Sequence, residues 1–210
     1  VKAGAKPSID VAATPITGLR IDLAGRHEHF TDFGNTNIGK ATIRYDITPA
    51  VAVRGTFSSG FRAPTLAEEH YTTVNVGPGT AFIQIPPNSV AATKLGLSGG
   101  LQPEKSTSFS FGVVLQPFDK LFASLDFFQI TVTNRIVGSG NLTGSITDDA
   151  GVTTIISQAV VDAALASGAS LDQVRNTGIN LFANGVDTRT RGAEFSLTYP
   201  TDLPLGRVDW

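Results

Sequence analysis

The sequence predicts an all-β protein, part of an antiparallel transmembrane β-barrel, and three observations support this fold class. Apolar and polar residues alternate with a period of two in several runs, most clearly in 108–116. Such alternation indicates strands with two different faces, and runs of about ten residues between turn clusters are typical of outer-membrane barrels. Charged residues are 16% of the 210 residues, below the roughly 25% of soluble domains. No stretch approaches the roughly 18 apolar residues of a membrane-spanning helix.

Composition narrows the classes of function. A net charge of −2 gives no reason to expect a nucleic-acid partner. Without cysteine there is no disulfide framework and no thiolate metal site. The chain has no methionine and no charged-then-apolar signal segment, and its last residues, Arg207–Trp210, start a further strand. We therefore expect an internal piece of a longer protein.

The first third of the chain predicts four strands joined by short turns. In the third of these strands Ala41, Ile43 and Tyr45 share one face, and Lys40, Thr42 and Arg44 share the other. The turns contain proline, or residues that tolerate positive φ. The expected strands are 8–13, 18–30, 38–47 and 51–59, and the expected turns are 14–17, 31–37 and 48–50.

Two long connections interrupt the second part of the chain, at 60–100 and 137–187. Connections of this length are unusual inside a compact soluble domain. They are expected on the outer side of an outer-membrane barrel, with tight turns on the periplasmic side. The strands expected around them are 103–116, 120–136, 188–199 and the start of one at 207–210, with turns at 117–119 and 200–206. The chain would thus hold about eight strands of a larger barrel.

The strand expected at 120–136 changes its apolar phase. Leu121, Ala123, Leu125 and Phe127 share one face, whereas the apolar residues that follow, Ile130 and Val132, have the opposite parity. A β-bulge near Phe128–Gln129 is one interpretation. The other is that the strand has left the hydrocarbon zone, where the facing rule no longer applies.

The second long connection carries the one clear helix signal. Ser157 is an expected N-cap, Ile156 is placed to pack against Val161, and Gly168 would end the helix. Ser170 and Gln173 have capping-box spacing for a second short helix.

Four motifs, in order, resemble the C-terminal half of the barrel of TonB-dependent outer-membrane receptors. The first is GFRAPTLAEE at 60–69, and the second is LQPEKS at 101–106. The third is SLDFFQI at 124–130 with NRI at 134–136, and the fourth is NGVDTRTRGAEF at 184–195. The resemblance covers nearly the whole chain, so we expect residues 1–210 to be one partial barrel domain.

The resemblance implies a barrel of about 22 strands in the outer membrane of a Gram-negative bacterium. It also implies energy-coupled uptake of a scarce ligand, with a ferric siderophore as the leading candidate. The implied partners are membrane lipid, an N-terminal plug domain, the TonB energy-coupling complex through a TonB box, and the small-molecule ligand. Plug, TonB box and terminal aromatic strand are not in this sequence, and no cofactor is implied.

Five charged residues lie on faces predicted to line the barrel lumen: Arg44, Arg54, Glu104, Asp126 and Glu194. A basic residue that faced lipid near the midplane would cost on the order of 2–4 kcal/mol, and an acidic residue less. These residues would either hold neighbouring strands or the plug together, or form a polar path for the ligand.

Two other groups are candidates for contacts. Phe61, Arg62 and Pro64, in the first motif, would contact the plug or a partner strand, or anchor the local turn. An apolar group in the first long connection would contact ligand or pack the connection on itself; its members are Phe82, Ile83 and Ile85.

Metal-binding and catalytic signals are weak. His27 and His29 share a strand face and suit a metal, but also a polar girdle position. His70 is isolated, and Asp148, Asp149 and Asp187 lie in expected loops where solvation is the simpler interpretation. No nucleophile elbow, phosphate loop or acid–base carboxylate pair is present in the sequence, so we do not expect an enzyme.

Two other classes remain open at the level of sequence. A passive porin-like channel would share the strands and loops but lack plug and TonB box. A soluble β-rich binding domain, such as a sandwich, would also show alternating strands.

Overall fold

The computed structural model describes residues 11–12, 18–31, 34–77, 80–97, 99–169, 176–203 and 206–209. The chain divides into two compact units. The sheet unit comprises Val1–Phe61, Lys105–Thr133 and Asp187–Trp210, and the loop unit comprises Arg62–Glu104 and Asn134–Val186.

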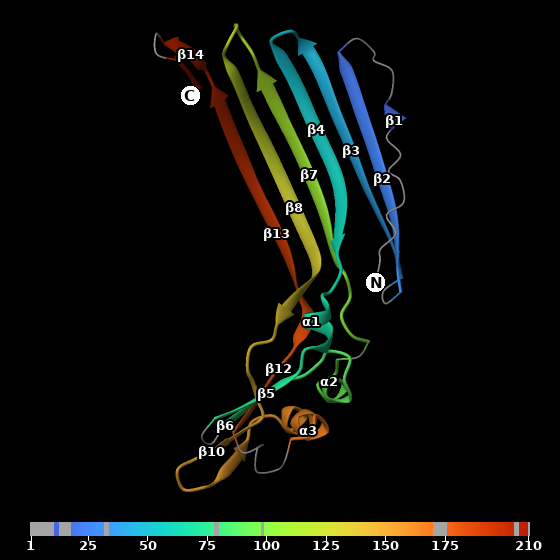
Figure 1. The fold of residues 1–210 in the computed structure, drawn as a ribbon, viewed down its shortest axis with the longest axis vertical. Coiled ribbons are helices and arrows are strands. Elements are labelled where there is room, and N and C mark those ends of the chain that lie inside the picture. Colours follow the sequence, from blue (N-terminus) through green and yellow to red (C-terminus); the bar gives the residue numbers. More distant parts are fainter. Residues whose placement is uncertain are drawn as a thin grey trace. The chain divides into compact units, whose positions relative to one another are not determined.

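The main element is a seven-stranded sheet in the order β1-β2-β3-β4-β7-β8-β13 (Figure 1). Strands that follow one another in the chain pair antiparallel, as the alternating pattern predicts. The order has two ends, so the sheet is open, as expected for part of a larger barrel. Its strands are β1 Val11–Ala12, β2 Leu19–Phe30, β3 Gly34–Thr48, β4 Val51–Arg62, β7 Glu104–Leu115, β8 Phe122–Gly138 and β13 Phe182–Thr198.

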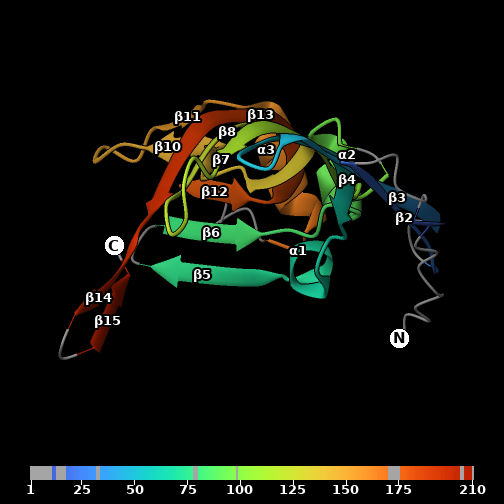
Figure 2. The same cartoon turned by 90° about the horizontal axis from the view of Figure 1, so that it is seen from above.

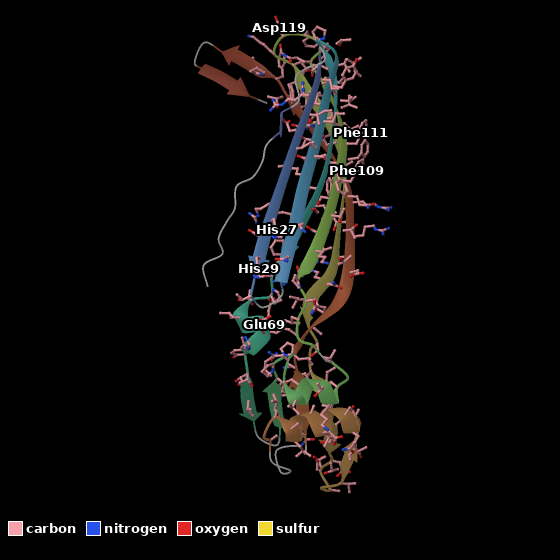
Figure 3. All side chains as sticks on the ribbon, turned by 90° about the vertical axis from the view of Figure 1, so that its right-hand side faces the viewer. His27, His29, Glu69, Phe109, Phe111 and Asp119 are labelled. Carbon is pink, nitrogen blue, oxygen red and sulfur yellow. The ribbon has the colours of Figure 1, made fainter. Side chains whose placement is uncertain are left out.

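The sheet has an apolar face and a polar face because side chains alternate along each strand. On the apolar face, residues of the same type lie opposite one another on neighbouring strands: Ile21 lies opposite Ile43, and Phe111 lies opposite Phe127. Phe109 and Phe111 project from the same side of the sheet (Figure 3). This face leaves large apolar side chains exposed, among them Leu23, Ile43, Tyr45, Ile47, Phe57, Phe109, Phe111, Leu125, Phe127, Phe195 and Leu197.

Two predicted boundaries are wrong. Strand β3 begins at Gly34, so the expected turn at 31–37 is shorter, and β2 pairs with β3 as far as Phe30 opposite Gly34. The positive φ of Gly34, 82°, lets the hairpin close there. The expected turn at 200–206 contains strand β14, Pro200–Leu203, which pairs with β15, Gly206–Asp209, in a separate two-stranded sheet.

Strand β8 has no bulge where its pattern changes. Its pairing with β7 is continuous from Ala123 opposite Leu115 to Thr133 opposite Lys105. The apolar face instead becomes polar beyond Phe127, where Gln129 and Thr131 follow. The end of the apolar band, rather than a bulge, therefore explains the change of phase.

The loop unit is formed by the two long connections, which are folded together. A four-stranded sheet has the order β5-β6-β12-β9, and its strands β5, β6 and β12 lie side by side in Figure 2. Strand β12 of the second connection pairs in parallel with β6 of the first. The elements are α1 Leu66–His70, β5 Thr73–Gly77, β6 Thr80–Gln84, α2 Val90–Lys94, β9 Leu142–Thr143, β10 Ser145–Thr147, β11 Thr153–Ile155, α3 Gln158–Ala166 and β12 Thr177–Asn180.

This unit has its own hydrophobic core. Small residues let helices α2 and α3 approach closely, and Gly144 leaves room for the side chains of Val160 and Val161. The two long connections are therefore not irregular loops but together form one packed unit. Its buried residues are Ile83, Ile85, Ala91, Ala92, Val160, Val161, Ala163, Ala164, Ile179 and Leu181.

The expected helix is present as α3, with Ser157 as its N-cap residue. The Ser157 side chain makes no capping hydrogen bond. Ile156 is 57% exposed, so more than half of its side chain is not covered by Val161 or by any other residue. Gly168 follows the helix with a φ of 94°, as a C-terminal glycine should. Ser170 and Gln173, expected in a second helix, lie outside the described residues. None of the helices in the described ranges is long and apolar enough to cross a membrane.

Candidate functional site

Arginines form a row across three strands on the polar face of the sheet. Arg44 lies opposite Arg20 on one side and opposite Arg54 on the other. Like charges directly opposite one another are unfavourable unless they are compensated. Each guanidinium lies beside a carboxylate: Arg20 beside Asp22 at 3.2 Å, Arg44 beside Asp46 at 2.9 Å, and Arg54 beside Asp126.

The Arg54–Asp126 pair bridges a whole strand. Arg54 is in β4 and Asp126 in β8, and β7 runs between them. Arg54 Nε donates to Asp126 Oδ1 at 2.8 Å, and Arg54 Nη2 donates to Asp126 Oδ2. Gly112 of β7 lies opposite Asp126, and a Cβ atom there would be 1.9 Å from Asp126 Oδ1. The bridge therefore depends on the missing side chain at Gly112.

Glu194, the fifth residue expected on this face, lies in β13 and is exposed. The sheet unit therefore brings Arg44, Arg54, Asp126 and Glu194 to one polar face, whereas Glu104 belongs to the loop unit.

A second charge network, which we call the arginine junction, is centred on Arg62. Arg62 Nη1 donates to Glu68 Oε2 at 3.0 Å, and Arg62 Nη2 donates to Glu104 Oε1 at 2.7 Å. Glu104 also accepts from the backbone N–H of Ile136 at 2.8 Å. Glu68 accepts from the backbone N–H of Thr65 at 2.7 Å in the capping box of α1. One guanidinium thus ties the first long connection to the start of β7, and Glu104 extends the network to the backbone of β8.

The partners in the arginine junction stabilise one another's charged forms. Hydrogen bonds to Glu104 and Glu68 raise the pKa of Arg62. The bond from Arg62 lowers the pKa of Glu104, against the opposing effect of burial. Burial acts to raise the pKa of Glu68, but hydrogen bonds from Arg62 and Thr65 outweigh it, so that this pKa is also lowered. Both carboxylates are therefore ionised at neutral pH.

The side chain of Asn184, also in the loop unit, makes three hydrogen bonds to backbone groups. Its side-chain oxygen accepts from the backbone N–H of Gln102 at 2.7 Å. Its amide nitrogen donates to the carbonyls of Gln102, at 2.8 Å, and Asn134, at 2.6 Å. Asn134 has a φ of 55°, in the left-handed region that asparagine tolerates better than most residues. Residues of three sequence motifs, those at 101–106, 134–136 and 184–195, meet at this side chain.

The other residues of the first motif have local contacts. Phe61 packs edge-to-face against Phe30, with ring centroids 5.5 Å apart. Pro64 is half-buried in the connection between β4 and α1. The bonds of Arg62 to Glu68 and Glu104 fit the alternative in which Arg62 anchors the local turn.

The apolar candidates of the first connection divide into two kinds. Ile83 and Ile85 are each 1% exposed and belong to the core of the loop unit. They have no surface to offer a ligand and pack the connection on itself, which corrects the expectation of a contact. Phe82 is 36% exposed, and its ring lies against Gly178 of β12.

The histidines are paired with neutral side chains. His27 Nδ1 lies 2.6 Å from Asn37 Oδ1, and His29 Nδ1 lies 2.7 Å from Asn35 Oδ1, as two adjacent cross-strand pairs of β2 and β3 (Figure 3). His70 lies 3.7 Å from Glu69. In the part of the chain that the structure describes, no three His, Asp or Glu side chains gather into a possible metal site.

The expected loop carboxylates have different settings. Asp148 accepts backbone hydrogen bonds from Ala150 and Val152, so it shapes the turn between β10 and β11. Its neighbour Asp149 is exposed. Asp187 lies within β13 rather than in a loop.

Three structural roles were not predicted from the sequence. The capping box of α1 has a local signal, a threonine three residues before a glutamate at Thr65 and Glu68. Gly112 and Asn184 have no such signal, because each depends on strands that are far apart in the chain.

An open, strongly two-faced antiparallel sheet with a folded unit of long connections is the architecture of a partial β-barrel. The family model described as "TonB dependent receptor-like, beta-barrel" matches residues 12–210, and the chain belongs to this family. TonB-dependent receptors are outer-membrane transporters of Gram-negative bacteria.

Solved structures agree with this fold. The ferric enterobactin receptor PfeA of Pseudomonas aeruginosa, in complex with BCV-L6, is 17% identical, with a TM-score of 0.61, over 94% of this chain and 24% of that chain. The siderophore receptor PirA of Acinetobacter baumannii is 18% identical, with a TM-score of 0.58, over 90% and 24%. The hemophore receptor HasR of Serratia marcescens, in complex with its hemophore HasA and heme, is 14% identical, with a TM-score of 0.51, over 88% and 29%.

The chain spans about a quarter of the length of these receptors. At these identities the likeness establishes the fold. No curated protein sequence matches significantly.

Proposed function

We propose that this chain forms part of the wall of an outer-membrane receptor that takes up a scarce ligand, a ferric siderophore, by energy-coupled transport. The observation that carries this proposal is the two-faced sheet of a chain in the TonB-dependent receptor family. One face is apolar and exposed, and the other carries compensated charges. A wall between lipid and an aqueous lumen requires these two faces.

In this proposal the apolar face contacts lipid and the polar face lines the lumen. The reverse arrangement would place Arg20, Arg44 and Arg54 in hydrocarbon, at a cost on the order of 2–4 kcal/mol for each arginine near the midplane. It would also leave Phe109 and Phe111 exposed to water, together with the rest of a large apolar patch.

The lumen-facing charges, in this proposal, mainly hold the wall together. Each arginine of the row has a carboxylate partner, so the row is largely neutralised. The Arg54–Asp126 pair links three successive strands, β4, β7 and β8. We keep a second possible role for the charged residues of this face, including Glu194: they would form a polar path for the ligand.

The ferric siderophore and the remaining partners rest on the family and on its solved members. Among the similar structures, PirA is described as a siderophore receptor and PfeA as a ferric enterobactin receptor, and HasR is described in complex with its hemophore and heme. We extend to this chain an N-terminal plug domain, the TonB complex and lipid of a Gram-negative outer membrane as partners. We place the loop unit, which contains Arg62 and the two long connections, on the outer side of the membrane.

Uptake of radiolabelled iron tests the proposal. Cells that lack their own siderophore receptors would express a full-length receptor containing this segment, and a panel of ferric siderophores would be offered. We expect accumulation of one class of chelate that stops when TonB is deleted or the proton-motive force is dissipated. Uptake of small solutes that needs neither would support a passive channel and contradict the proposal. A receptor segment that stays monodisperse in water without detergent would contradict both membrane assignments.

A further inference from the structure

Two histidines lie on one face of strand β2, close to the turn that joins it to β3. His27 and His29 are alternate residues of an extended strand, so both side chains leave the same face, and both are exposed. Figure 3 shows them one after the other along the strand. Their Cα atoms are about 6.5 Å apart, twice the rise per residue. Imidazoles at this spacing are able to lean together onto a single metal ion.

The partners of the two histidines fix which ring nitrogen carries the hydrogen. His27 Nδ1 lies 2.6 Å from Oδ1 of Asn37, and His29 Nδ1 lies 2.7 Å from Oδ1 of Asn35. A carboxamide oxygen only accepts hydrogen bonds, so each Nδ1 donates. The lone pair of each neutral imidazole is then on Nε2. Metal-binding histidines have this arrangement, in which the second ring nitrogen donates to an oxygen of the protein.

The backbone pairing of the hairpin produces this arrangement twice. His27 lies opposite Asn37, and His29 lies opposite Asn35, in the register of β2 and β3. Each asparagine is therefore held beside its histidine by the strands themselves, and the same hydrogen bond forms in both rows. Two Nε2 lone pairs are thus presented on one face by a rigid element.

The surroundings of the two histidines leave room for a cation. The neighbouring row on this face is Gly25 opposite Gly39, which carries no side chains. A Cβ at Gly25 would meet nothing within 4 Å. Among the described residues from Gly25 to Gly39, the only lysine or arginine is Arg26, whose parity places it on the opposite face. The hairpin therefore offers a cation neither a steric barrier nor a like charge on this face.

The histidine pair is separate from the charges of the polar face. His27 and His29 have the parity of Leu23, whereas Arg20 has the opposite parity. Leu23 is the last large apolar residue on this face of β2, and the histidines follow it at about 13 Å and 20 Å along the strand. In the proposed function the pair lies on the outside of the wall, beyond the apolar band, and not in the lumen. An ion bound there would not be the transported ligand.

We propose that His27 and His29 bind one divalent transition-metal ion through their Nε2 atoms, and that Asn37 and Asn35 hold the rings in the binding tautomer. Imidazole suits copper, nickel and zinc, whereas calcium and magnesium prefer oxygen ligands. Affinity follows the general order for divalent ions, with Cu²⁺ above Ni²⁺ and Zn²⁺. Among the described residues no third His, Asp or Glu joins the pair. Water completes the coordination, so the ion exchanges with solvent, unlike a four-ligand structural zinc.

The test titrates chloride salts of Cu²⁺, Ni²⁺, Zn²⁺ and Mg²⁺ into a full-length receptor that contains this segment, purified in detergent without a histidine tag. Isothermal titration calorimetry measures affinity and stoichiometry. His27→Gln and His29→Gln are compared with His70→Gln, which changes the remaining histidine of the chain. We expect each strand variant to bind Cu²⁺ on the order of a hundredfold more weakly, because it lacks the second, intramolecular ligand. His70→Gln should bind Cu²⁺ like the wild type.

Variants of the asparagines test the proposed tautomer while both histidines are kept. Asn35→Leu with Asn37→Leu removes the two acceptors and should weaken Cu²⁺ binding roughly tenfold, at the lower end of the usual range for such partners. Asn35→Asp with Asn37→Asp keeps an acceptor oxygen at each position and should bind Cu²⁺ at least as tightly as the wild type. Unchanged affinity in the leucine variant would contradict the role of the asparagines.

Electron paramagnetic resonance identifies the ligands of the bound ion. The difference spectrum of Cu²⁺ between the wild type and His27→Gln should show two nitrogen ligands. Equal Cu²⁺ affinity of the wild type and either strand-histidine variant would overturn the proposal, as would Mg²⁺ binding as tight as that of Cu²⁺. Energy-coupled uptake of the transported ligand should persist in all these variants, so failure of this proposal and failure of the proposed function give different results.

Discussion

At the scale of single residues, Gly112 decides whether a charge pair can form across a strand. Arg54 and Asp126 are in strands two places apart, and their side chains meet over the backbone of β7. A side chain at Gly112 would occupy the position of the Asp126 carboxylate. Here the absence of a Cβ atom, rather than backbone freedom, is the property of glycine that matters.

We predict that Gly112→Ala destabilises the barrel by about 1–3 kcal/mol, the usual range for an overpacked site. Urea unfolding of a full-length receptor in detergent micelles measures the change. Gly25→Ala is the matched control, since nothing lies within 4 Å of a Cβ at Gly25. In an Asp126→Ser background the Gly112→Ala change should cost much less. An undiminished cost in that background would contradict the role given to Gly112.

The arginine junction predicts a pH dependence. Because the pKa values of Glu104 and Glu68 are lowered in the folded state, their contribution to stability is fully present above the ordinary glutamate pKa of about 4.3. It is lost as the pH falls through the lowered values. The thermal midpoint of the wild-type receptor should therefore fall more steeply below about pH 4.3 than that of Glu104→Gln.

The two curves should converge at low pH and differ most at neutral pH. Asp149→Asn, an exposed change in the same unit, is the control and should follow the wild type. Parallel curves for the wild type and Glu104→Gln across the whole range would show that the Arg62–Glu104 bond does not stabilise the fold.

At the scale of elements, the strands illustrate what alternation can predict. The faces of β3, β4 and β7 follow directly from the period of two, and the pairing of Phe111 with Phe127 confirms the assignment for β7 and β8. Strand ends were less predictable. Gly34–Asn37 are polar and turn-like in composition, yet cross-strand pairing with β2 extends the strand over them.

The fold of the two long connections could not be predicted from the sequence. Their fold depends on β6 and β12, which are distant in the chain and pair in parallel. The apolar signal at Ile83 and Ile85 was visible, but burial in a core and exposure to a ligand produce the same local pattern. Arg62 was recognised as a site residue from its motif, whereas its partner Glu104 was assigned to a lumen face; only the folded chain brings the two together.

The faces of β7 predict opposite effects of two adjacent substitutions. Phe111→Arg would place a cation on the apolar face, at a cost of about 2–4 kcal/mol near the membrane midplane. Ser110→Arg would place it on the polar face, where it should be tolerated. The measurement is the fraction of full-length receptor inserted into vesicles, read from heat-modifiable mobility on gels. Equal effects of the two changes would contradict the assignment of faces.

At the scale of the whole molecule, the chain combines two units with different sources of stability. The sheet unit exposes most of its large apolar side chains, so it has little core of its own. The loop unit buries apolar residues from both long connections in one cluster. Hydrogen bonds between paired strands stabilise the sheet unit, as does contact with lipid in the proposed function. Packing of apolar side chains stabilises the loop unit.

Cooperative unfolding of the loop unit follows from its shared core. Ile179 of β12 is fully buried, so Ile179→Ala should cost about 2–5 kcal/mol. Hydrogen exchange followed by mass spectrometry should show faster exchange in both connections, including β6. Residues Lys105–Thr133, which form β7 and most of β8 in the sheet unit, should stay protected. Ile155→Ala, at an exposed position, is the control. Faster exchange confined to the second connection would contradict a shared core.

The central claim is that one face of this sheet contacts lipid and the other faces water. The chain contains no cysteine, so single cysteines within it can carry spin labels at successive positions of β7. The measurement is the accessibility of labels at 108, 109, 110, 111 and 113, in a full-length receptor in bilayers, to oxygen and to a water-soluble nickel chelate. We predict oxygen access at 109, 111 and 113 and chelate access at 108 and 110. Uniform accessibility along the strand, or the opposite alternation, would contradict the account.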